Sequence, residues 1–151
     1  MAETMYAAPG VGLAATQIGE PHRIFLIDIA GEDEPSNLIV FINPEFVRKD
    51  GEQCGPEGCL SFPGVSEDIK RAAKVTVRAL DRKGEPFELT AEGLLSVAIQ
   101  HENDHLDGVL MIDRMARSRS ASSSGRCRSA GPRALPDSAP RRVRLDRWRP
   151  G

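Results

Sequence analysis

Residues 100–110 read QHENDHLDGVL, in which two histidines lie four positions apart and a glutamate directly follows the first. The chain has only three histidines in 151 residues. From Ala91 to Leu106 the apolar residues recur at helical spacing, with Thr90 placed to cap the start of a helix and Gly108 to end it. This pattern predicts a helix on which the two imidazoles lie one turn apart on the same face.

Two imidazoles in this arrangement can bind one metal ion, and Glu102 is placed to reach a water on the metal rather than the metal itself. The alternative is a surface helix with two solvated histidines. The residues before the motif are apolar, however, and Leu94 and Ala98 fall on the same stripe as His101 and His105. Because an unpaired histidine pair on a buried stripe would be unfavourable, the motif favours a metal-dependent hydrolase.

A catalytic metal site of this kind needs a third protein ligand and an open position. The acids downstream of His105 are Asp107, Asp113, Asp137 and Asp146. The first two are too close in sequence and the last two lie in an unusual C-terminal segment, so we expect the third ligand from upstream. Cys59, in the glycine-rich segment EGCLS, is the best candidate because a thiolate binds divalent transition metals strongly. Cys54 is its competitor, although a small buried apolar role suits Cys54 better.

The remaining pattern predicts one α+β domain, with a mixed or antiparallel sheet packed around the central HExxH helix. We expect a helix at residues 1–8, strands at 23–29, 38–42, 74–80 and 86–90, and the helix at 91–106. The last two strands read as a β-hairpin. Residues 50–65 are crowded with glycine and proline, so they predict an ordered but irregular loop.

Composition sets broad limits on location and redox state. The hydrophobic fraction of 40% and charged fraction of 28% are ordinary for a globular protein. No apolar run is long enough to cross a bilayer, and the start MAETMYAAPG lacks a signal-peptide pattern. We therefore expect a cytoplasmic protein without a membrane partner. Three cysteines in such a chain argue against a disulfide framework, which leaves a Cys54–Cys59 bridge as the less favoured alternative.

Charge divides the chain near Met115. Residues 1–115 carry ten basic and twenty acidic residues, whereas residues 116–151 carry ten arginines, no lysine and two aspartates. We expect a catalytic domain at 1–115 and a disordered Arg/Ser/Pro-rich tail at 116–151. Such a tail can bind nucleic acid or the ribosome through its arginines, or it can be adventitious. The abrupt junction and the lack of lysine favour the second interpretation, so specific nucleic-acid binding is not expected.

Three segments, in order, resemble the signature motifs of the peptide deformylases. They are GVGLAATQIG from Gly10, EGCLS at Glu57–Ser61 and QHENDH at Gln100–His105. The resemblance covers residues 3–114, and EGCLS is the form typical of bacterial-type enzymes. It implies a metal-dependent hydrolase that removes the formyl group from the N-terminal formylmethionine of nascent polypeptides and releases formate. Its substrates would be formylmethionyl chains, which such an enzyme could meet at the ribosome.

The same resemblance implies roles for individual residues. The metal ligands would be Cys59, His101 and His105, and the ion would usually be Fe²⁺, with Zn²⁺, Ni²⁺ or Co²⁺ as alternatives. The catalytic groups would be Glu102 as general acid and base, and Gln17 and the backbone N–H of Leu60 as oxyanion donors. The substrate contacts would be the backbones of Gly12 and Gly58 and a methionine pocket formed by Val11, Leu94 and Val97.

The chain also departs from the family pattern at both ends. It lacks the family's N-terminal segment, and the Arg/Ser/Pro-rich tail replaces a C-terminal amphipathic helix. Each large apolar side chain lost is worth about 1.5–3 kcal/mol, and a domain is stable by only about 5–15 kcal/mol, so we expect a marginal fold. Two alternatives remain: an HExxH metallopeptidase, which would need a downstream acidic ligand, and a non-catalytic truncated fragment with a basic RNA-binding tail.

Overall fold

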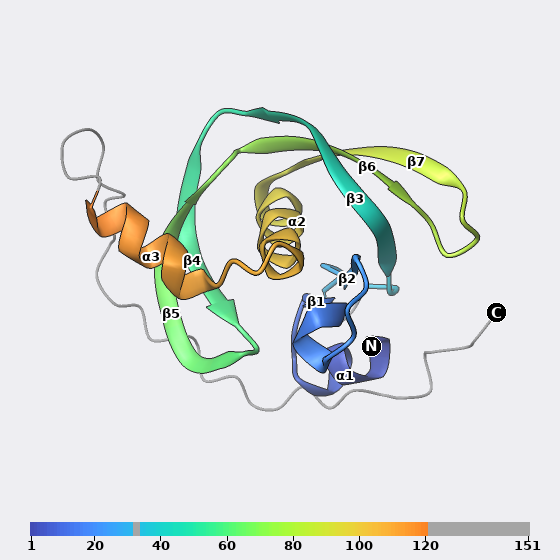
Figure 1. Cartoon of the computed structure of the whole chain (residues 1–151), viewed down its shortest axis with the longest axis horizontal. Helices are drawn as coiled ribbons and strands as arrows, with labels where there is room; N and C mark the ends of the chain where they lie inside the picture. Colours follow the sequence, from blue (N-terminus) through green and yellow to red (C-terminus); the bar gives the residue numbers. More distant parts are fainter. Residues whose placement is uncertain (32–33, 121–151) are drawn as a thin grey trace.

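Helix α2 (Gly93–Leu106) lies in the middle of the molecule, and the strands surround it. The computed structural model describes residues 1–31 and 34–120, with side chains to Met115. Figure 1 shows one sheet curving over α2, a hairpin with α3 along its side, and α1 with two short strands beneath it. The other elements are α1 (Ala2–Ala7), β1 (Gly12–Ala14), the 3-10 helix η1 (Ala15–Ile18), β2 (Ile24–Ile27), β3 (Ile39–Asp50), β4 (Gln53–Cys59), β5 (Phe62–Arg71), β6 (Lys74–Leu80), β7 (Pro86–Glu92) and α3 (Met111–Ser120).

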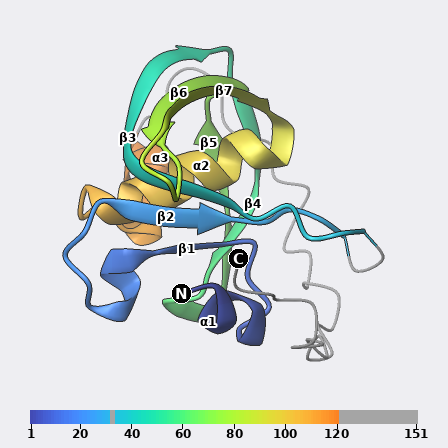
Figure 2. The same ribbon diagram turned by 90° about the vertical axis from the view of Figure 1, so that its right-hand side faces the viewer.

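Two antiparallel sheets account for the described strands. The larger has the order β1-β2-β3-β6-β7, and the smaller is the β4–β5 hairpin. Every strand pair in the described residues is antiparallel. Figure 2 shows the same arrangement from the side, with α2 running beneath the curved strands β3, β6 and β7. The α+β fold with an HExxH helix surrounded by antiparallel sheet is therefore confirmed.

The main core lies between α2 and the larger sheet. Phe25 and Phe41 are fully buried and stack on adjacent strands with their ring centroids 4.7 Å apart. In β6, Val75 and Val77 alternate with exposed or half-buried neighbours, as expected for a strand with one face on the core. Ile99 of α2 is completely buried in the same cluster, so the helix is held by its apolar contacts with the sheet.

The glycine- and proline-rich segment at 50–65 is not the irregular loop that its composition predicts. Most of it belongs to the hairpin of β4 and β5, whose register pairs Gln53 with Arg71 and Gly58 with Ser66. Proline lacks a backbone N–H and is excluded from central strands, but both strands of a two-stranded sheet are edges, where Pro56 is tolerated. The composition was therefore compatible with a strand at a sheet edge.

Two predicted boundaries are also wrong. Strand β3 was expected to end at Asn43–Pro44, but it continues to Asp50 through a register shift, with Asn43 at φ 51°. The bulge absorbs the proline without ending the strand. Thr90 does not cap α2, because it remains in β7, where its hydroxyl lies 3.0 Å from that of Thr76. Glu92 occupies the N-cap position instead.

Helical structure continues past Met115, since α3 ends at Ser120. The prediction of a disordered tail lies, from residue 121 onward, outside the described residues. Among the helices that the structure describes, none combines the length and the apolar character needed to span a lipid bilayer.

Candidate metal centre and active site

Polar contacts along its length hold helix α2 in register against the neighbouring segments. In the middle of the helix, Gln100 accepts a hydrogen bond from the Ala72 N–H at 3.1 Å and donates one to the Ala72 carbonyl at 3.0 Å. Ser96 donates to the same carbonyl at 3.0 Å. Near its end, the Thr16 hydroxyl donates to the carbonyl of His105 at 3.1 Å. These contacts fix how far along its axis the helix presents its histidines.

Cys59, His101 and His105 form a cluster of potential metal ligands. One ligand atom from each lies within 4.8 Å of the others. The Cys59 sulfur is 3.3 Å from His105 Nε2, which in turn is 3.2 Å from His101 Nε2. The Cys59 side chain comes from the end of β4, so two distant parts of the chain meet here. Both imidazoles are buried, as the apolar stripe predicted.

These spacings fit a metal ion. Metal–nitrogen bonds of about 2.0–2.1 Å and metal–sulfur bonds of about 2.3 Å in a tetrahedral site place the ligand atoms about 3.3–3.7 Å apart. The separations of 3.3 Å between Cys59 and His105 and 3.2 Å between the two histidines lie at or just below the lower end of this range. The donor set also suits the ion, because a thiolate and two imidazoles are characteristic ligands of divalent transition metals.

The electrostatics of the cluster favour a bound cation. Burial alone would raise the pKa of the Cys59 thiol, but hydrogen bonds from the two histidines and from the Ser61 backbone lower it to about 5. Burial alone would lower the pKa of His101, but its hydrogen bonds with Cys59 and Glu57 raise it to about 10. The sulfur is therefore a thiolate at neutral pH, and the negative charges of Cys59 and Glu57 favour positive charge at the imidazoles between them, whether a proton or a metal ion.

Glu102 is a buried carboxylate, 5% exposed, beside these ligands. Its Oε2 atom has no hydrogen-bond partner among the described residues. Burial raises the pKa of Glu102 to about 7, against the opposing charges of His101 and His105. A buried carboxylate oxygen is unfavourable unless a ligand or a water molecule donates a hydrogen bond to it. Because its pKa is near neutral, Glu102 is suited to proton transfer.

Gly12 packs directly against this carboxylate. A β-carbon at Gly12 would lie 2.5 Å from Glu102 Oε1 and 2.8 Å from its Cγ. We expect Gly12→Ala to displace Glu102 and to lower formate release about 10–100-fold with the metal retained, because small displacements of a catalytic group cost rates of this order. Steady-state formate release and metal content measured on the same sample check this expectation.

The matched control is Gly55→Ala. Gly55 lies in β4, and a β-carbon there meets nothing within 4 Å. This variant should keep the parent rate and metal content. A Gly12→Ala protein that turns over as fast as the parent would show that close packing on Glu102 is not needed.

Gln17 and Leu60 lie next to the cysteine ligand. The Gln17 side-chain carbonyl accepts a hydrogen bond from the Ala14 N–H at 2.9 Å, which leaves its amide nitrogen directed at the EGCLS segment. That nitrogen lies 3.0 Å from the Ser61 hydroxyl and 3.9 Å from the Cys59 sulfur. Leu60 directly follows the cysteine and is 37% exposed. Both residues therefore border the cluster.

The predicted substrate contacts are accessible to different degrees. Val11 and Leu94 are 36% and 57% exposed, and Val97 is half-buried. Leu94 is therefore exposed, and the prediction that it would be buried is wrong. Gly12 is buried and Gly58 exposed. Since Val97 and Leu94 precede His101 by four and seven positions, helix geometry puts both on the ligand face, within about 10 Å along the axis.

A family model described as Polypeptide deformylase matches residues 1–121. The chain belongs to this family. The peptide deformylase of Xylella fastidiosa (strain M12) is 54% identical to it over 116 residues, which cover 77% of this chain and 67% of that protein. Family membership and the intact Cys59/His101/His105 metal-binding site support peptide deformylase activity, a hydrolase reaction of protein biosynthesis.

Solved structures of peptide deformylases share the fold. The crystal structure of a peptide deformylase from Synechococcus elongatus in complex with actinonin matches with a TM-score of 0.73 and 48% identity, over 76% of this chain and 62% of that chain. The one from Legionella pneumophila matches with a TM-score of 0.68 and 50% identity, over 78% of this chain and 72% of that chain. This chain thus spans about two thirds of the length of the peptide deformylases that it matches.

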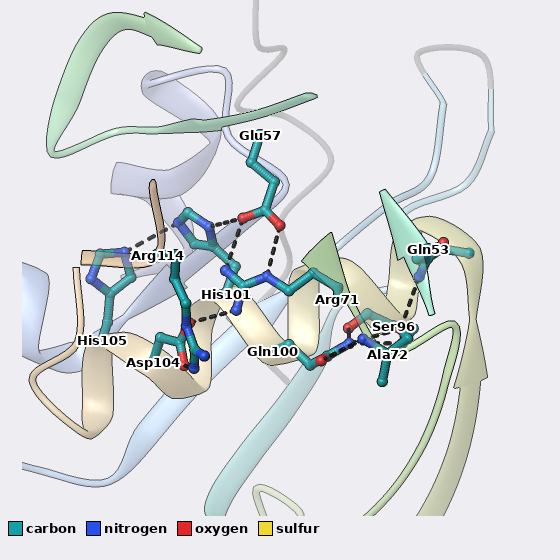
Figure 3. A network of polar contacts seen from close by, with 11 residues as sticks. Gln53, Glu57, Arg71, Ala72, Ser96, Gln100, His101, Asp104, His105 and Arg114 are labelled. Carbon is teal, nitrogen blue, oxygen red and sulfur yellow. Dashed lines mark hydrogen bonds and ion pairs between the residues drawn. The ribbon is translucent and has the colours of Figure 1, made fainter. Parts of the chain in front are cut away.

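The sequence interpretation did not single out the residues that support the ligands of this deformylase site. Glu57 accepts a hydrogen bond from His101 Nδ1 at 2.9 Å and is bound by Arg71, which also binds Asp104 of α2, and Arg114 binds the same aspartate (Figure 3). A supporting role for the glutamate of EGCLS could have been predicted, because a histidine ligand usually donates a hydrogen bond from its second ring N–H to a carboxylate or carbonyl. Nothing in the local sequence pattern points to the two arginines.

Proposed function

We propose that this chain removes the formyl group from N-formylmethionyl nascent polypeptides by metal-assisted hydrolysis and releases formate. The observation that carries the proposal is the convergence of Cys59, His101 and His105 beside Glu102, whose Oε2 has no partner among the described residues. The donor set supports Fe²⁺, Zn²⁺, Ni²⁺ or Co²⁺, and Fe²⁺ is the ion that the family resemblance favours. A bound ion would supply Lewis-acid chemistry, lowering the pKa of a water molecule and polarising the formyl carbonyl.

The chain's own residues then divide the remaining work. Glu102 accepts the proton that the attacking water loses. As the formyl carbon becomes tetrahedral, its oxygen gains negative charge, which the Gln17 amide and the Leu60 N–H stabilise by donating hydrogen bonds. A single donor of this kind is worth about 2.7–4 kcal/mol in the transition state. Glu102 finally returns the proton to the leaving amine, which yields formate and a free amino terminus.

Substrate binding is assigned to the surface beside this centre. The accessible side chains of Val11, Leu94 and Val97 support an apolar contact for methionine, and the backbones of Gly12 and Gly58 are proposed to bind the peptide. Formylated chains emerge from the ribosome, so the proposed place of action is the cytoplasm, at or near translating ribosomes.

The metallopeptidase alternative has no support in the described residues. It requires an acidic ligand downstream of the histidines, but the Asp107 carboxylate bonds with Arg23 and Asn103. The Asp113 carboxylate accepts a hydrogen bond from the Leu110 N–H. The third member of the ligand cluster is instead the upstream Cys59.

A formate-release assay tests the proposal. The full chain is loaded with Fe²⁺ without oxygen, or with Co²⁺ or Ni²⁺, and given formyl-Met-Ala-Ser, with acetyl-Met-Ala-Ser as the control substrate. We expect formate release in proportion to metal content and no reaction with the acetyl peptide. Folded, fully loaded protein that releases formate no faster than the free metal ion would overturn the proposal.

A further inference from the structure

A chain of buried ion pairs leads away from the metal ligand His101. Glu57 accepts its hydrogen bond from His101, and Arg71 holds both oxygens of that glutamate through Nε at 2.7 Å and Nη2 at 2.9 Å. The side chains of Glu57 and Arg71 are 4% and 3% exposed. A carboxylate held by two hydrogen bonds keeps a single orientation, so Glu57 fixes the orientation of the His101 imidazole, from which it accepts a hydrogen bond.

The ion pairs continue from Arg71 to helix α3. Its remaining nitrogen, Nη1, donates to Asp104 Oδ2 at 2.5 Å, and Arg114 donates to both oxygens of the same aspartate, at 2.5 and 3.0 Å. Figure 3 shows Glu57, Arg71, Asp104 and Arg114 in continuous contact, with His101 at one end. We call these four residues the ion-pair chain.

Arg114 is one of two guanidinium groups that donate to Asp104, the other being Arg71. Arg71 also binds Glu57, so the two carboxylates of the ion-pair chain share it. Without Arg114, Asp104 would keep only Arg71 as a guanidinium partner, so Arg71 would be drawn toward Asp104 and its hold on Glu57 would weaken.

Helix α3 also supports the cysteine ligand, Cys59. Met111, 2% exposed, belongs to a small apolar cluster with Cys59 and Ile69. Helix α3 therefore packs against Cys59 through Met111 and, through Arg114, binds the ion-pair chain that leads to His101. These two contacts reach the centre by independent routes.

We infer that α3 is a positioning element of the metal centre and that Arg114 sets the orientation of His101 through the ion-pair chain. The inference rests on the proposed metal site and deepens it, because it assigns part of the metal affinity to a residue that cannot touch the metal. Arg114 is a positioning residue, separated from the ligand by three side chains.

Metal affinity of the full-length protein tests this role. The metal-stripped parent, Arg114→Ala and Arg114→Lys are titrated with Co²⁺ against a competing chelator, and the absorption spectrum of each cobalt protein is recorded. Supporting partners next to a ligand are worth about 10–100-fold in affinity, so for the more distant Arg114→Ala we expect about 3–10-fold weaker binding and a shifted spectrum. Lysine restores the charge but not the two-pronged contact, so Arg114→Lys should recover only part of the loss.

The matched control is Arg78→Ala. Arg78 makes a single exposed ion pair with Glu88, at 3.2 Å between β6 and β7, so its loss should leave cobalt affinity and spectrum unchanged.

The Arg114 side chain is 35% exposed and borders a cavity of about 270 Å³, so its removal exposes Asp104 to water and does not create a closed void. If Arg114→Ala nevertheless fails to fold, Arg114→Lys decides, since reduced affinity supports the inference and parental affinity overturns it.

A double-mutant cycle with Asp104→Asn separates positioning from general destabilisation. If Arg114 acts through Asp104, then Arg114→Ala should have no further effect on cobalt affinity once Asp104 is replaced. Parental affinity and spectrum for Arg114→Ala, or fully additive losses in the cycle, would overturn the inference. Neither readout depends on formate release. If the protein released no formate but Arg114 and Asp104 still affected cobalt affinity together, the proposed reaction would be wrong and the positioning role would be supported.

Discussion

Replacing Glu102 with glutamine should lower formate release about 10²–10⁴-fold while the protein keeps its metal ion. Glutamine has the same shape, but its amide cannot accept the proton from the attacking water. The carboxylate is 5% exposed and adjacent to His101, and its Oε2 has no partner among the described residues. No other described carboxylate has this combination of burial and an unoccupied oxygen at the centre, so no neighbour can take over its role. The measurement is kcat/KM for formate release, with metal content determined on the same preparation.

Glu45→Gln provides the matched control. Glu45 is an exposed carboxylate on β3 and is not a member of the ligand cluster, so its replacement should leave both turnover and metal content at parental values. Near-parental formate release by Glu102→Gln with metal present would show that another group accepts the proton.

Cys59→Ser should weaken metal binding by more than about 100-fold. Loss of a residue that only supports a ligand costs up to about 100-fold in affinity, and loss of the ligand itself should cost more. The thiol pKa of about 5 makes Cys59 a thiolate at neutral pH. A serine hydroxyl stays protonated there and is a poor ligand for a transition metal. Competition with a chelator gives the dissociation constant directly, and formate release should fall with the loss of bound metal.

Cys54→Ser is the control for this change. Cys54 lies on the same strand with an exposed side chain, outside the ligand cluster, so we expect metal affinity near the parental value. Retention of metal by Cys59→Ser together with its loss in Cys54→Ser would reassign the third ligand.

The histidine helix was predictable because its signals are local. Helical spacing of apolar residues and two histidines four positions apart place both imidazoles on one face, whatever the rest of the chain does. Cys59 could be proposed as the third ligand only by exclusion of the downstream acids and by resemblance. The distance of 3.3 Å between its sulfur and His105 depends on tertiary structure.

Other features could not be read from local sequence. Proline and glycine in 50–65 suggested a loop because composition does not reveal that a strand will lie at the edge of a two-stranded sheet. The pairing of Arg71 with Glu57 and Asp104 joins residues 14 and 33 positions apart, which no period of a helix or strand predicts. The roles assigned to Gln17 and Leu60 remain predictions.

The separation of Cys59 from His105 by 46 positions has a consequence for the lifetime of the protein. A cation held by both residues joins the hairpin to the central helix, and because the ligands meet only in the folded chain, binding of the ion stabilises the folded state. Depletion of the ion should therefore expose the β4–β5 hairpin to hydrogen exchange and proteolysis before the larger sheet opens. We therefore expect the supply of the ion to set the stability of the folded protein as well as its turnover.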